Sequence, residues 1–329
     1  MSRAIVVTRP SDSPAHADLV TDRADAPLGV NEVRVDVEYS SINFKDGLAL
    51  TGRPGVIKAE SLVAGIDLVG TVAEVGPATP SARVGDRVLV NGCGIGETHD
   101  GGLAERAVVD ADWLVPLPGP ISPRRAAAIG TAGFTAMLAV LAIEKTLAPG
   151  DDVLVTGASG GVGSIAIALL SRLGYRVTAS TGRSEEKGYL RSLGAVDVID
   201  RATLSDPGKP LQSQRWAAAV DSVGSHTLAN VLAQTNYGGV VATCGLAQGA
   251  DLPATVMPFI LRSVTLSGIN SVYCPMPLRR EAWNRLASDL DLDLLDSLTA
   301  SVGLDGAMGV AEQIMSGGVR GRTVVDVRA

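Results

Sequence analysis

Hydrophobic and polar residues alternate in short runs through the first third of the chain. The runs at 32–38, 70–76 and 86–90 place an apolar residue at nearly every second position, and turn-forming residues bound each run. A period of two residues is typical of β-strands that bury one face. The pattern therefore predicts a small, irregular, β-rich barrel in this part of the chain.

A Pro-rich stretch at 115–123 ends this pattern and marks the expected domain boundary. After it, an apolar helix is predicted at 125–142. Further along, apolar runs of strand length alternate with segments long enough to form helices. The predicted strands are 153–156, 176–180, 196–200, 217–221 and 240–244. This order indicates βαβ units and a parallel, doubly wound sheet.

The C-terminal segment returns to a mixed pattern. It predicts a polar helix at 279–288 and a strand at 322–327, and we place that strand back on the first domain. We therefore expect an α/β protein with two domains. Residues 1–123 and 275–329 would form the β-rich domain, and residues 124–274 the doubly wound domain.

Composition and charge agree with two globular domains and narrow the range of partners. The 329 residues are 46% hydrophobic and 19% charged, and the net charge of -7 comes without a Lys/Arg cluster longer than a pair. We therefore expect no nucleic-acid partner and no membrane partner. The N-terminal residues lack a secretion-signal pattern, which favours a cytoplasmic location. Because Cys93, Cys244 and Cys274 lie far apart, we expect reduced thiols that bind no metal.

A glycine-rich turn at 152–163 is the strongest single motif. A buried strand runs directly into this turn, and a small-residue helix is predicted at 164–173. Gly160 and Gly163 lack the Cβ atoms that would block a close approach of phosphate and helix, and the positive end of the helix faces the pyrophosphate. Ala158 occupies the position where the usual dinucleotide-binding fingerprint has its first glycine. A glycine-rich turn without a ligand is the alternative.

The residues that follow the second predicted strand bear on the choice of cofactor. An NAD site would place Asp or Glu there, but the chain reads Ser-Thr-Gly-Arg-Ser at 180–184. Arg183, flanked by Thr181 and Gly182, offers a guanidinium to the 2′-phosphate, so NADPH is favoured over NADH. The alternative is that Arg183 is a solvated surface residue.

Six segments spread over the whole chain resemble one known family. They are SSINFKDGLALTG at 40–52, GGLAE at 101–105, IGTAGFTAM at 129–137, TGASGGVG at 156–163, NYGG at 236–239 and LPATVMPFILR at 252–262. Together they closely resemble the acrylyl-CoA reductase/quinone oxidoreductase subfamily of the medium-chain dehydrogenase/reductase family. The resemblance implies a GroES-like domain, a Rossmann domain, NADPH as hydride donor and a homodimer. It further implies reduction of acrylyl-CoA to propionyl-CoA.

The resemblance also assigns cofactor-binding residues by position. By this resemblance, the pyrophosphate would be bound by Ser159, Gly160, Gly161 and Val162. The 2′-phosphate would be bound by Thr181, Gly182 and Arg183. The residues that would line the nicotinamide end and its surroundings are Phe44, Leu246, Ile260, Ser271 and Arg322. Thr131 and Ser222 complete the expected cofactor-binding set.

The segment at 40–46 holds the candidate catalytic residues. Asn43 and Asp46 are the nearest polar side chains for orienting the substrate and the nicotinamide. For Asp46 the alternative is a helix cap or an ion pair near Lys45. Relatives often have Tyr where this chain has Phe44, and that phenol is a candidate proton donor. Without it, water or another side chain must deliver the proton.

The zinc ligands of related alcohol dehydrogenases are missing from this sequence. Ile66 stands where the zinc enzymes place His, and residues 40–46 contain no cysteine. We therefore expect no metal site. Without a Lewis acid, the compatible reactions are hydride additions to an activated acceptor.

Three functions remain open at this point. The first is reduction of the C=C bond of an enoyl thioester by hydride transfer to its β-carbon. The second is an NADPH:quinone oxidoreductase, which would share every cofactor feature. The third is a non-catalytic NADPH sensor.

Overall fold

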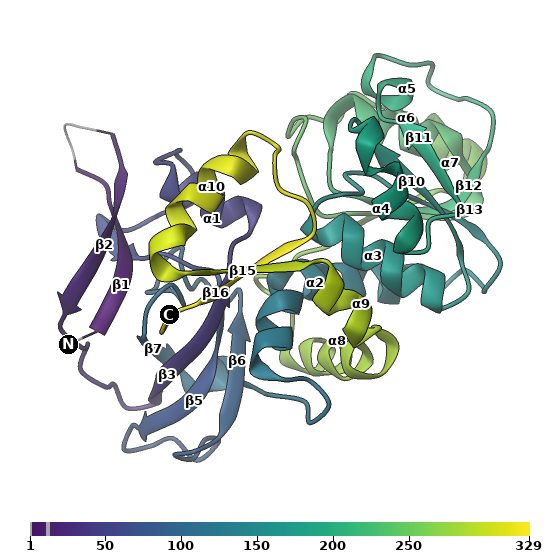
Figure 1. Cartoon of the computed structure of the whole chain (residues 1–329). Helices are drawn as coiled ribbons and strands as arrows, with labels where there is room; N and C mark the ends of the chain where they lie inside the picture. Colours follow the sequence, from purple (N-terminus) through teal and green to yellow (C-terminus); the bar gives the residue numbers. More distant parts are fainter. Residues whose placement is uncertain (1, 11–13) are drawn as a thin grey trace. The chain divides into compact units, whose positions relative to one another are not determined.

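The computed structural model describes residues 2–10 and 14–329, which form two compact units. Unit 1 comprises Met1–Thr131, Ser271–Ala287 and Leu295–Ala329, and unit 2 comprises Ala132–Asn270 and Ser288–Leu294 (Figure 1). The chain thus leaves unit 1 once for most of unit 2, and again for a short excursion near its C-terminal end.

The observed unit boundaries correct the expected ones. Residues 124–131 belong to unit 1, because Arg125 forms an ion pair of 2.7 Å with Asp296 of that unit. The change of unit falls between Thr131 and Ala132, inside the helix that follows the Pro-rich stretch. Residues 271–274 also belong to unit 1, whereas 288–294 belong to unit 2.

Unit 1 is built on two sheets. The larger sheet has the order β15-β16-β3-β5-β6-β8, and β7 also pairs with β3; the smaller has the order β2-β1-β4. The strands are β1 (Ser2–Thr8), β2 (His16–Arg23), β3 (Glu32–Ser41), β4 (Ser61–Val63), β5 (Asp67–Val75), β6 (Arg87–Asn91), β7 (Arg106–Asp110), β8 (Val115–Pro116), β15 (Thr299–Gly303) and β16 (Arg322–Asp326).

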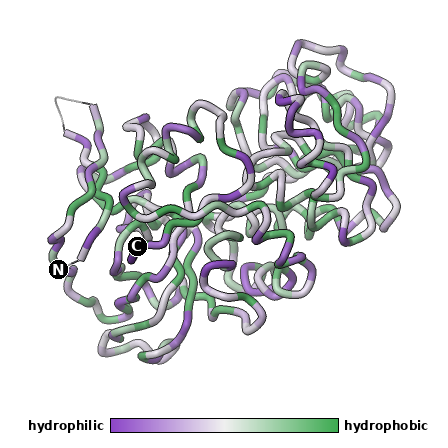
Figure 2. Tube along the Cα trace, in the orientation of Figure 1, coloured by the Kyte–Doolittle hydropathy of each residue, from purple (hydrophilic) through white to green (hydrophobic). Residues whose placement is uncertain are grey.

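The period of two predicted for this region is present in the core of unit 1. Val33, Val35 and Val37 of β3 are fully buried, and hydrophobic and hydrophilic stretches alternate along the strands (Figure 2). Strand β16 pairs antiparallel with β3, with Val324 opposite Ser41. The return of the C-terminal strand to the first unit is therefore confirmed.

Four helices complete unit 1, and two of them, α8 and α9, extend into the segment 288–294 of unit 2. They are α1 (Phe44–Leu50), α8 (Met276–Asp289), α9 (Leu292–Ser297) and α10 (Ala307–Met315), with 3₁₀ turns at Ala111–Trp113 and Leu304–Gly306. The polar helix expected at 279–288 corresponds to α8.

Unit 2 is a six-stranded sheet in which every strand pair is parallel. Its order is β11-β10-β9-β12-β13-β14. The strands are β9 (Asp152–Val155), β10 (Arg176–Thr181), β11 (Asp197–Asp200), β12 (Trp216–Asp221), β13 (Thr235–Thr243) and β14 (Thr265–Gly268). The helices are α3 (Gly161–Arg172), α4 (Lys187–Ser192), α5 (Ala202–Ser205), α6 (Ser225–Gln234) and α7 (Met257–Arg262), with a 3₁₀ turn at Ser184–Glu186. All five predicted strands are present, and β14 is an additional edge strand.

Helix α2 (Pro123–Ile143) covers the apolar helix predicted at 125–142. It is long and apolar enough to cross a membrane, but 83% of its most apolar window is buried inside the structure. Gly130, with φ 48° and ψ -160°, breaks the helix near its first third. Burial and the break both describe a core helix rather than a membrane span.

Candidate functional site

The glycine-rich turn of unit 2 joins β9 to α3 and has the geometry of an anion site. Gly160 is the N-cap of the twelve-residue helix α3. A Cβ at Gly163 would lie 2.5 Å from the Gly157 carbonyl oxygen, so only glycine allows the helix to pack this closely on the turn. A Cβ at Gly160 would lie 3.3 Å from that oxygen. The N–H groups of the first helical turn, including those of Gly161 and Val162, have no partner within the helix and suit a phosphate.

Arg183 lies against this turn. Its Nη2 donates a hydrogen bond of 2.8 Å to Ser159 Oγ, and its backbone N–H donates to Thr181 Oγ1 at 3.2 Å. Its Nη1 is 3.9 Å from a carboxylate oxygen of Glu186. The structure thus brings the residues expected at the 2′-phosphate beside those expected at the pyrophosphate, and the Arg183 side chain is only 26% exposed.

A second guanidinium, which the sequence reasoning missed, lies next to Gly182. A Cβ at Gly182 would collide with Arg201, and the Arg201 N–H donates to the Thr181 carbonyl oxygen at 2.9 Å. Arg201 comes directly after β11, which pairs in parallel with β10. The carboxyl ends of neighbouring parallel strands meet at one edge of a sheet, and this rule is the signal that could have found Arg201.

Ser222 lies on the other side of the turn, directly after β12. Its Oγ donates to the Thr156 carbonyl oxygen at 3.2 Å. The preceding Asp221 is fully buried and accepts hydrogen bonds from Thr156 Oγ1 at 2.6 Å and from the Gly224 N–H at 3.0 Å. Burial raises the pKa of Asp221. This carboxyl group therefore ties the ends of β9 and β12 together beneath the turn.

The remaining expected residues of unit 2 are exposed. Leu246 follows β13 and is 57% exposed, and Ile260 lies on α7 and is 71% exposed. Large exposed apolar side chains are available to a ligand or to another protein chain.

In unit 1 the expected site residues converge on a carboxylate that the sequence reasoning did not single out. Asp67, at the start of β5, is fully buried. Its Oδ1 accepts hydrogen bonds from the Thr131 N–H at 2.8 Å, from Thr131 Oγ1 at 2.6 Å and from Asn91 Nδ2 at 2.6 Å. Its Oδ2 accepts from Ser41 Oγ at 2.5 Å and from Asn43 Nδ2 at 2.8 Å.

Arg322 lies beside the same carboxylate and is 2% exposed. Its Nη2 is 3.9 Å from Asp67 Oδ2 and donates to Ser41 Oγ at 2.8 Å. Its Nη1 donates to Asn43 Oδ1 at 3.1 Å, and its Nε to the Ala128 carbonyl oxygen at 2.6 Å. Burial lowers the pKa of Arg322, and the charges of Asp67 and of a second carboxyl group in the cluster oppose that shift.

That second carboxyl group is Asp46. Its Oδ2 accepts from the Asn43 N–H at 2.8 Å and from Asn43 Nδ2 at 3.1 Å, and its Oδ1 accepts from the Ile66 N–H at 3.0 Å. Asp46 therefore caps the start of α1, as one of its two interpretations expected. Lys45 instead pairs with Glu97 at 2.9 Å. Burial, and then the charge of Asp67, raise the pKa of Asp46 to about 7.

The break in α2 makes room for this cluster. A Cβ at Gly130 would collide with Asp67 Oδ2 and would lie 2.8 Å from the Arg322 guanidinium. The positive φ at this position also disfavours any other residue. Gly130 is thus required by the polar cluster rather than by the helix.

Two further expected residues lie in unit 1. Phe44 is the first residue of α1 and is 45% exposed. The Ser271 carbonyl oxygen accepts a hydrogen bond of 2.9 Å from Arg279, which also donates to the Asn91 carbonyl oxygen at 2.6 Å. Because Asn91 binds Asp67, a chain of hydrogen bonds connects Ser271 to the cluster.

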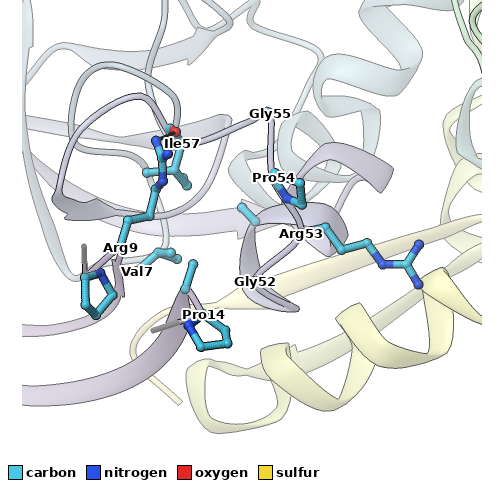
Figure 3. A pocket seen from close by; sticks show the side chains of 11 residues that line it. Val7, Arg9, Pro14, Gly52, Arg53, Pro54, Gly55 and Ile57 are labelled. Atoms are coloured by element: carbon cyan, nitrogen blue, oxygen red, sulfur yellow. Dashed lines mark hydrogen bonds between the residues drawn. The ribbon is translucent and has the colours of Figure 1, made fainter. Parts of the chain in front are cut away.

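Within the described part of the chain, neither a set of metal ligands nor a recess in unit 1 adds a residue to the site. Over residues 2–10 and 14–329, no group of three or more His, Cys, Asp or Glu side chains could hold a metal ion. The three cysteines are free thiols. A recess of about 260 Å³ in unit 1 contains, among its described lining residues, Arg9, whose guanidinium reaches the Ile57 carbonyl oxygen at 2.5 Å (Figure 3). No expected site residue is among those lining residues.

A parallel sheet with a glycine-rich turn, joined to a β-rich unit, defines a dinucleotide-dependent oxidoreductase. Family models agree with this class. The alcohol dehydrogenase GroES-like domain matches residues 29–119, and the zinc-binding dehydrogenase model matches residues 161–289.

Comparison with individual proteins narrows the class further. The chain is 47% identical over 332 residues to the acrylyl-CoA reductase AcuI of Ruegeria pomeroyi, covering 100% of both chains. It is 46% identical over 89% of both chains to YhfP of Bacillus subtilis, which is named as a quinone oxidoreductase. The structure of yhdH from Salmonella enterica in complex with NADP has a TM-score of 0.95 and 47% identity, covering 99% of both chains. That of Bacillus subtilis yhfP with NAD bound has a TM-score of 0.93 and 42% identity, also covering 99% of both.

The chain therefore belongs to the medium-chain dehydrogenase/reductase family and, within it, to the acrylyl-CoA reductase subfamily. The expected fold of a GroES-like domain and a Rossmann domain is confirmed.

Proposed function

We propose that this protein reduces the conjugated C=C bond of a short enoyl thioester with NADPH, converting acrylyl-CoA to propionyl-CoA. The observation that carries the acceptor is the 47% identity over the full length of a protein named acrylyl-CoA reductase. The observation that carries the cofactor is the position of Arg183 against Ser159 on the glycine-rich turn. A cytoplasmic location agrees with this metabolic role.

The proposed 2′-phosphate site of unit 2 has two cationic side chains. Arg183 and Arg201 both lie next to Gly182, and no acid ends β10. Guanidinium groups bind phosphate through charge-assisted hydrogen bonds, whereas the ribose hydroxyls of NADH would offer them only neutral partners. The side chains of this region therefore favour NADPH.

The protein's own groups bind and orient the cofactor and the substrate and exclude water from them, while NADPH supplies the hydride. Hydride reaches the β-carbon because conjugation places the electrophilic character there. Phe44 has no exchangeable proton, so water or another side chain delivers the proton to the α-carbon. In this proposal Arg322 lies at the nicotinamide end, as the family resemblance implies. Thr131 and Asn43, which bind the Asp67 carboxylate beside Arg322, serve that end with it.

The second candidate function is NADPH:quinone oxidoreductase. The name of the Bacillus subtilis relative favours it, and the same cofactor residues would serve it. A third possibility, a non-catalytic NADPH sensor, is tested by the same measurement as the other two.

A homodimer is also part of the proposal. Strand β14 is at the edge of the unit 2 sheet, and Val256, Met257, Ile260 and Leu261 at α7 expose apolar side chains. An unpaired strand edge and an apolar patch favour contact with a second chain. Light scattering of the purified protein should give twice the mass of one chain, and a monomer mass would contradict the dimer.

The acceptor is tested with a panel of acrylyl-CoA, crotonyl-CoA and quinones, each with NADPH and with NADH. We expect the highest kcat/KM for acrylyl-CoA with NADPH. Efficient turnover of a quinone without turnover of acrylyl-CoA would transfer the assignment to the second candidate. Binding of NADPH without turnover of any acceptor would favour the sensor.

A further inference from the structure

Asp67 gathers its partners from parts of the chain that are far apart in sequence. The five hydrogen bonds that it accepts come from residues 41, 43, 91 and 131. Every one of them is donated to the carboxyl group, so all five bonds depend on its two oxygens as acceptors. Bonds to a carboxylate are about twice as strong as neutral ones, and they hold each donor in one orientation.

The consequence for Thr131 is specific. Both its N–H and its hydroxyl donate to Asp67 Oδ1, at 2.8 and 2.6 Å. The rotation of this hydroxyl is thereby fixed. Because its proton is directed at Asp67, the Thr131 hydroxyl can act towards a ligand only as a hydrogen-bond acceptor, as the amide group of a nicotinamide would require.

The consequence for Asn43 and Arg322 is similar. Asn43 Nδ2 donates to Asp67 Oδ2 and to Asp46 Oδ2, whereas Asn43 Oδ1 accepts from Arg322. The carboxylates thus fix the direction of the amide. Asp67 also balances the charge of Arg322, which is buried with it.

We propose that Asp67 is a positioning residue for the nicotinamide end of the cofactor. It acts through Thr131, Asn43 and Arg322 and does not touch the reacting atoms. The proposal rests on the proposed function, because those three residues are placed at the nicotinamide end by that function.

Asp100 shows what a carboxylate with a structural role looks like in the same unit. It accepts from the Val63 N–H at 2.8 Å and from Arg23 at 2.7 Å, so it links β4 and β2, the two outer strands of the smaller sheet. Neither partner is an expected site residue. Asp100→Asn is therefore the matched control for Asp67→Asn.

The test compares the wild-type protein with both variants by three measurements. These are the dissociation constant of adenosine 2′,5′-bisphosphate, the fluorescence emission of bound NADPH, and kcat with its primary isotope effect from NADPH deuterated at the transferred position. For Asp67→Asn we expect a bisphosphate constant within about twofold of wild type and an altered nicotinamide emission. We also expect about a 100-fold loss of kcat and a larger isotope effect, because misplacement of the reacting atoms slows hydride transfer. Asp100→Asn should match wild type in all three measurements.

A variant pair at Thr131 covers the case in which Asp67→Asn does not fold. Thr131→Val removes the hydroxyl that Asp67 orients, and Thr131→Ser retains it. We expect Thr131→Val to alter the emission and the isotope effect, and Thr131→Ser, which keeps the hydroxyl, to alter both less than Thr131→Val does. Wild-type emission and isotope effect in Asp67→Asn, or in Thr131→Val where Asp67→Asn is unfolded, would overturn the proposal.

Failure of the proposed function gives a different result. The bisphosphate and emission measurements require no acceptor, so a wrong acceptor leaves them informative. If wild-type protein does not bind NADPH, the proposed function fails before any variant is compared.

Discussion

The two units build their candidate sites in opposite ways. In unit 2 the turn from Thr156 to Gly163 offers a candidate phosphate site largely from backbone N–H groups of consecutive residues. In unit 1 the cluster around Asp67 is made of side chains from β3, β5, β6, α2 and β16. The backbone site needs small residues and a helix end, whereas the side-chain cluster needs a specific hydrogen-bonding side chain at each position. Substitutions should therefore damage the two sites differently.

The largest effect is expected where the backbone meets the side-chain cluster. Gly130→Ala would force a Cβ onto Asp67 and would place alanine in a conformation suited to glycine. Strain and overpacking should together lower the free energy of unfolding by about 3 to 5 kcal/mol. Urea denaturation measures this loss. In the same unit, a Cβ at Gly309 of α10 has no described neighbour within 4 Å, so Gly309→Ala should be neutral or stabilising by up to about 1 kcal/mol. Equal effects of the two substitutions would contradict this prediction.

Asp46→Asn should change how the stability of unit 1 depends on pH. The ordinary pKa of 3.8 is raised to about 7 in the folded protein, so between these values the folded state holds a proton that the unfolded chain has released. Stability therefore falls as the pH rises from about 4 to 7 and levels off above that. The asparagine variant should lack this component, which is on the order of 4 kcal/mol across the window. Parallel stability curves of wild type and variant against pH would show that Asp46 does not titrate in this range.

Arg183→Ala tests the side-chain part of the unit 2 site. Losing a charge-assisted contact to the 2′-phosphate costs about 1.5 to 3 kcal/mol, or roughly 10- to 150-fold in the ratio of kcat/KM for NADPH to that for NADH. Arg201→Ala should lower the same ratio by a smaller factor, because Arg201 is exposed to solvent. The value of kcat/KM for NADH should change little in either variant. An unchanged ratio in both variants would exclude the two arginines from the site.

The smallest effect is expected from chelators. Ile66 replaces the histidine ligand of the zinc enzymes, and residues 40–46 contain no cysteine. Activity should therefore be unchanged after treatment with EDTA. Stoichiometric zinc in the purified protein, with loss of activity on its removal, would contradict this expectation.

The same contrast explains which features the sequence could predict. The parallel sheet and the turn follow from local patterns, since alternating strands and helices and the glycines of 156–163 are contiguous in the chain. Arg183 could be singled out because it lies two residues after the end of a strand. The Asp67 cluster could not be predicted, because its members are joined only by the fold. One signal was available, namely a charged residue in the middle of the otherwise apolar segment 64–70, since a buried carboxylate requires partners.

Two other features show the limits of local pattern. The change of unit within α2 depends on Gly130, and a single glycine in an apolar helix does not reveal a break. Arg201 was missed because the relation between β10 and β11 appears only when the strand order is known. The capping role of Asp46 was one of two open alternatives, and the geometry identifies it.

The central claim is that hydride passes from NADPH to the β-carbon of an enoyl thioester. It is tested most directly by the position of label in the product of acrylyl-CoA reduction. With NADPH deuterated at the transferred position, the deuterium should appear at C3 of propionyl-CoA, and in deuterated water the solvent label should appear at C2. Deuterium from NADPH at C2, or the absence of propionyl-CoA while a quinone is reduced efficiently, would contradict the claim.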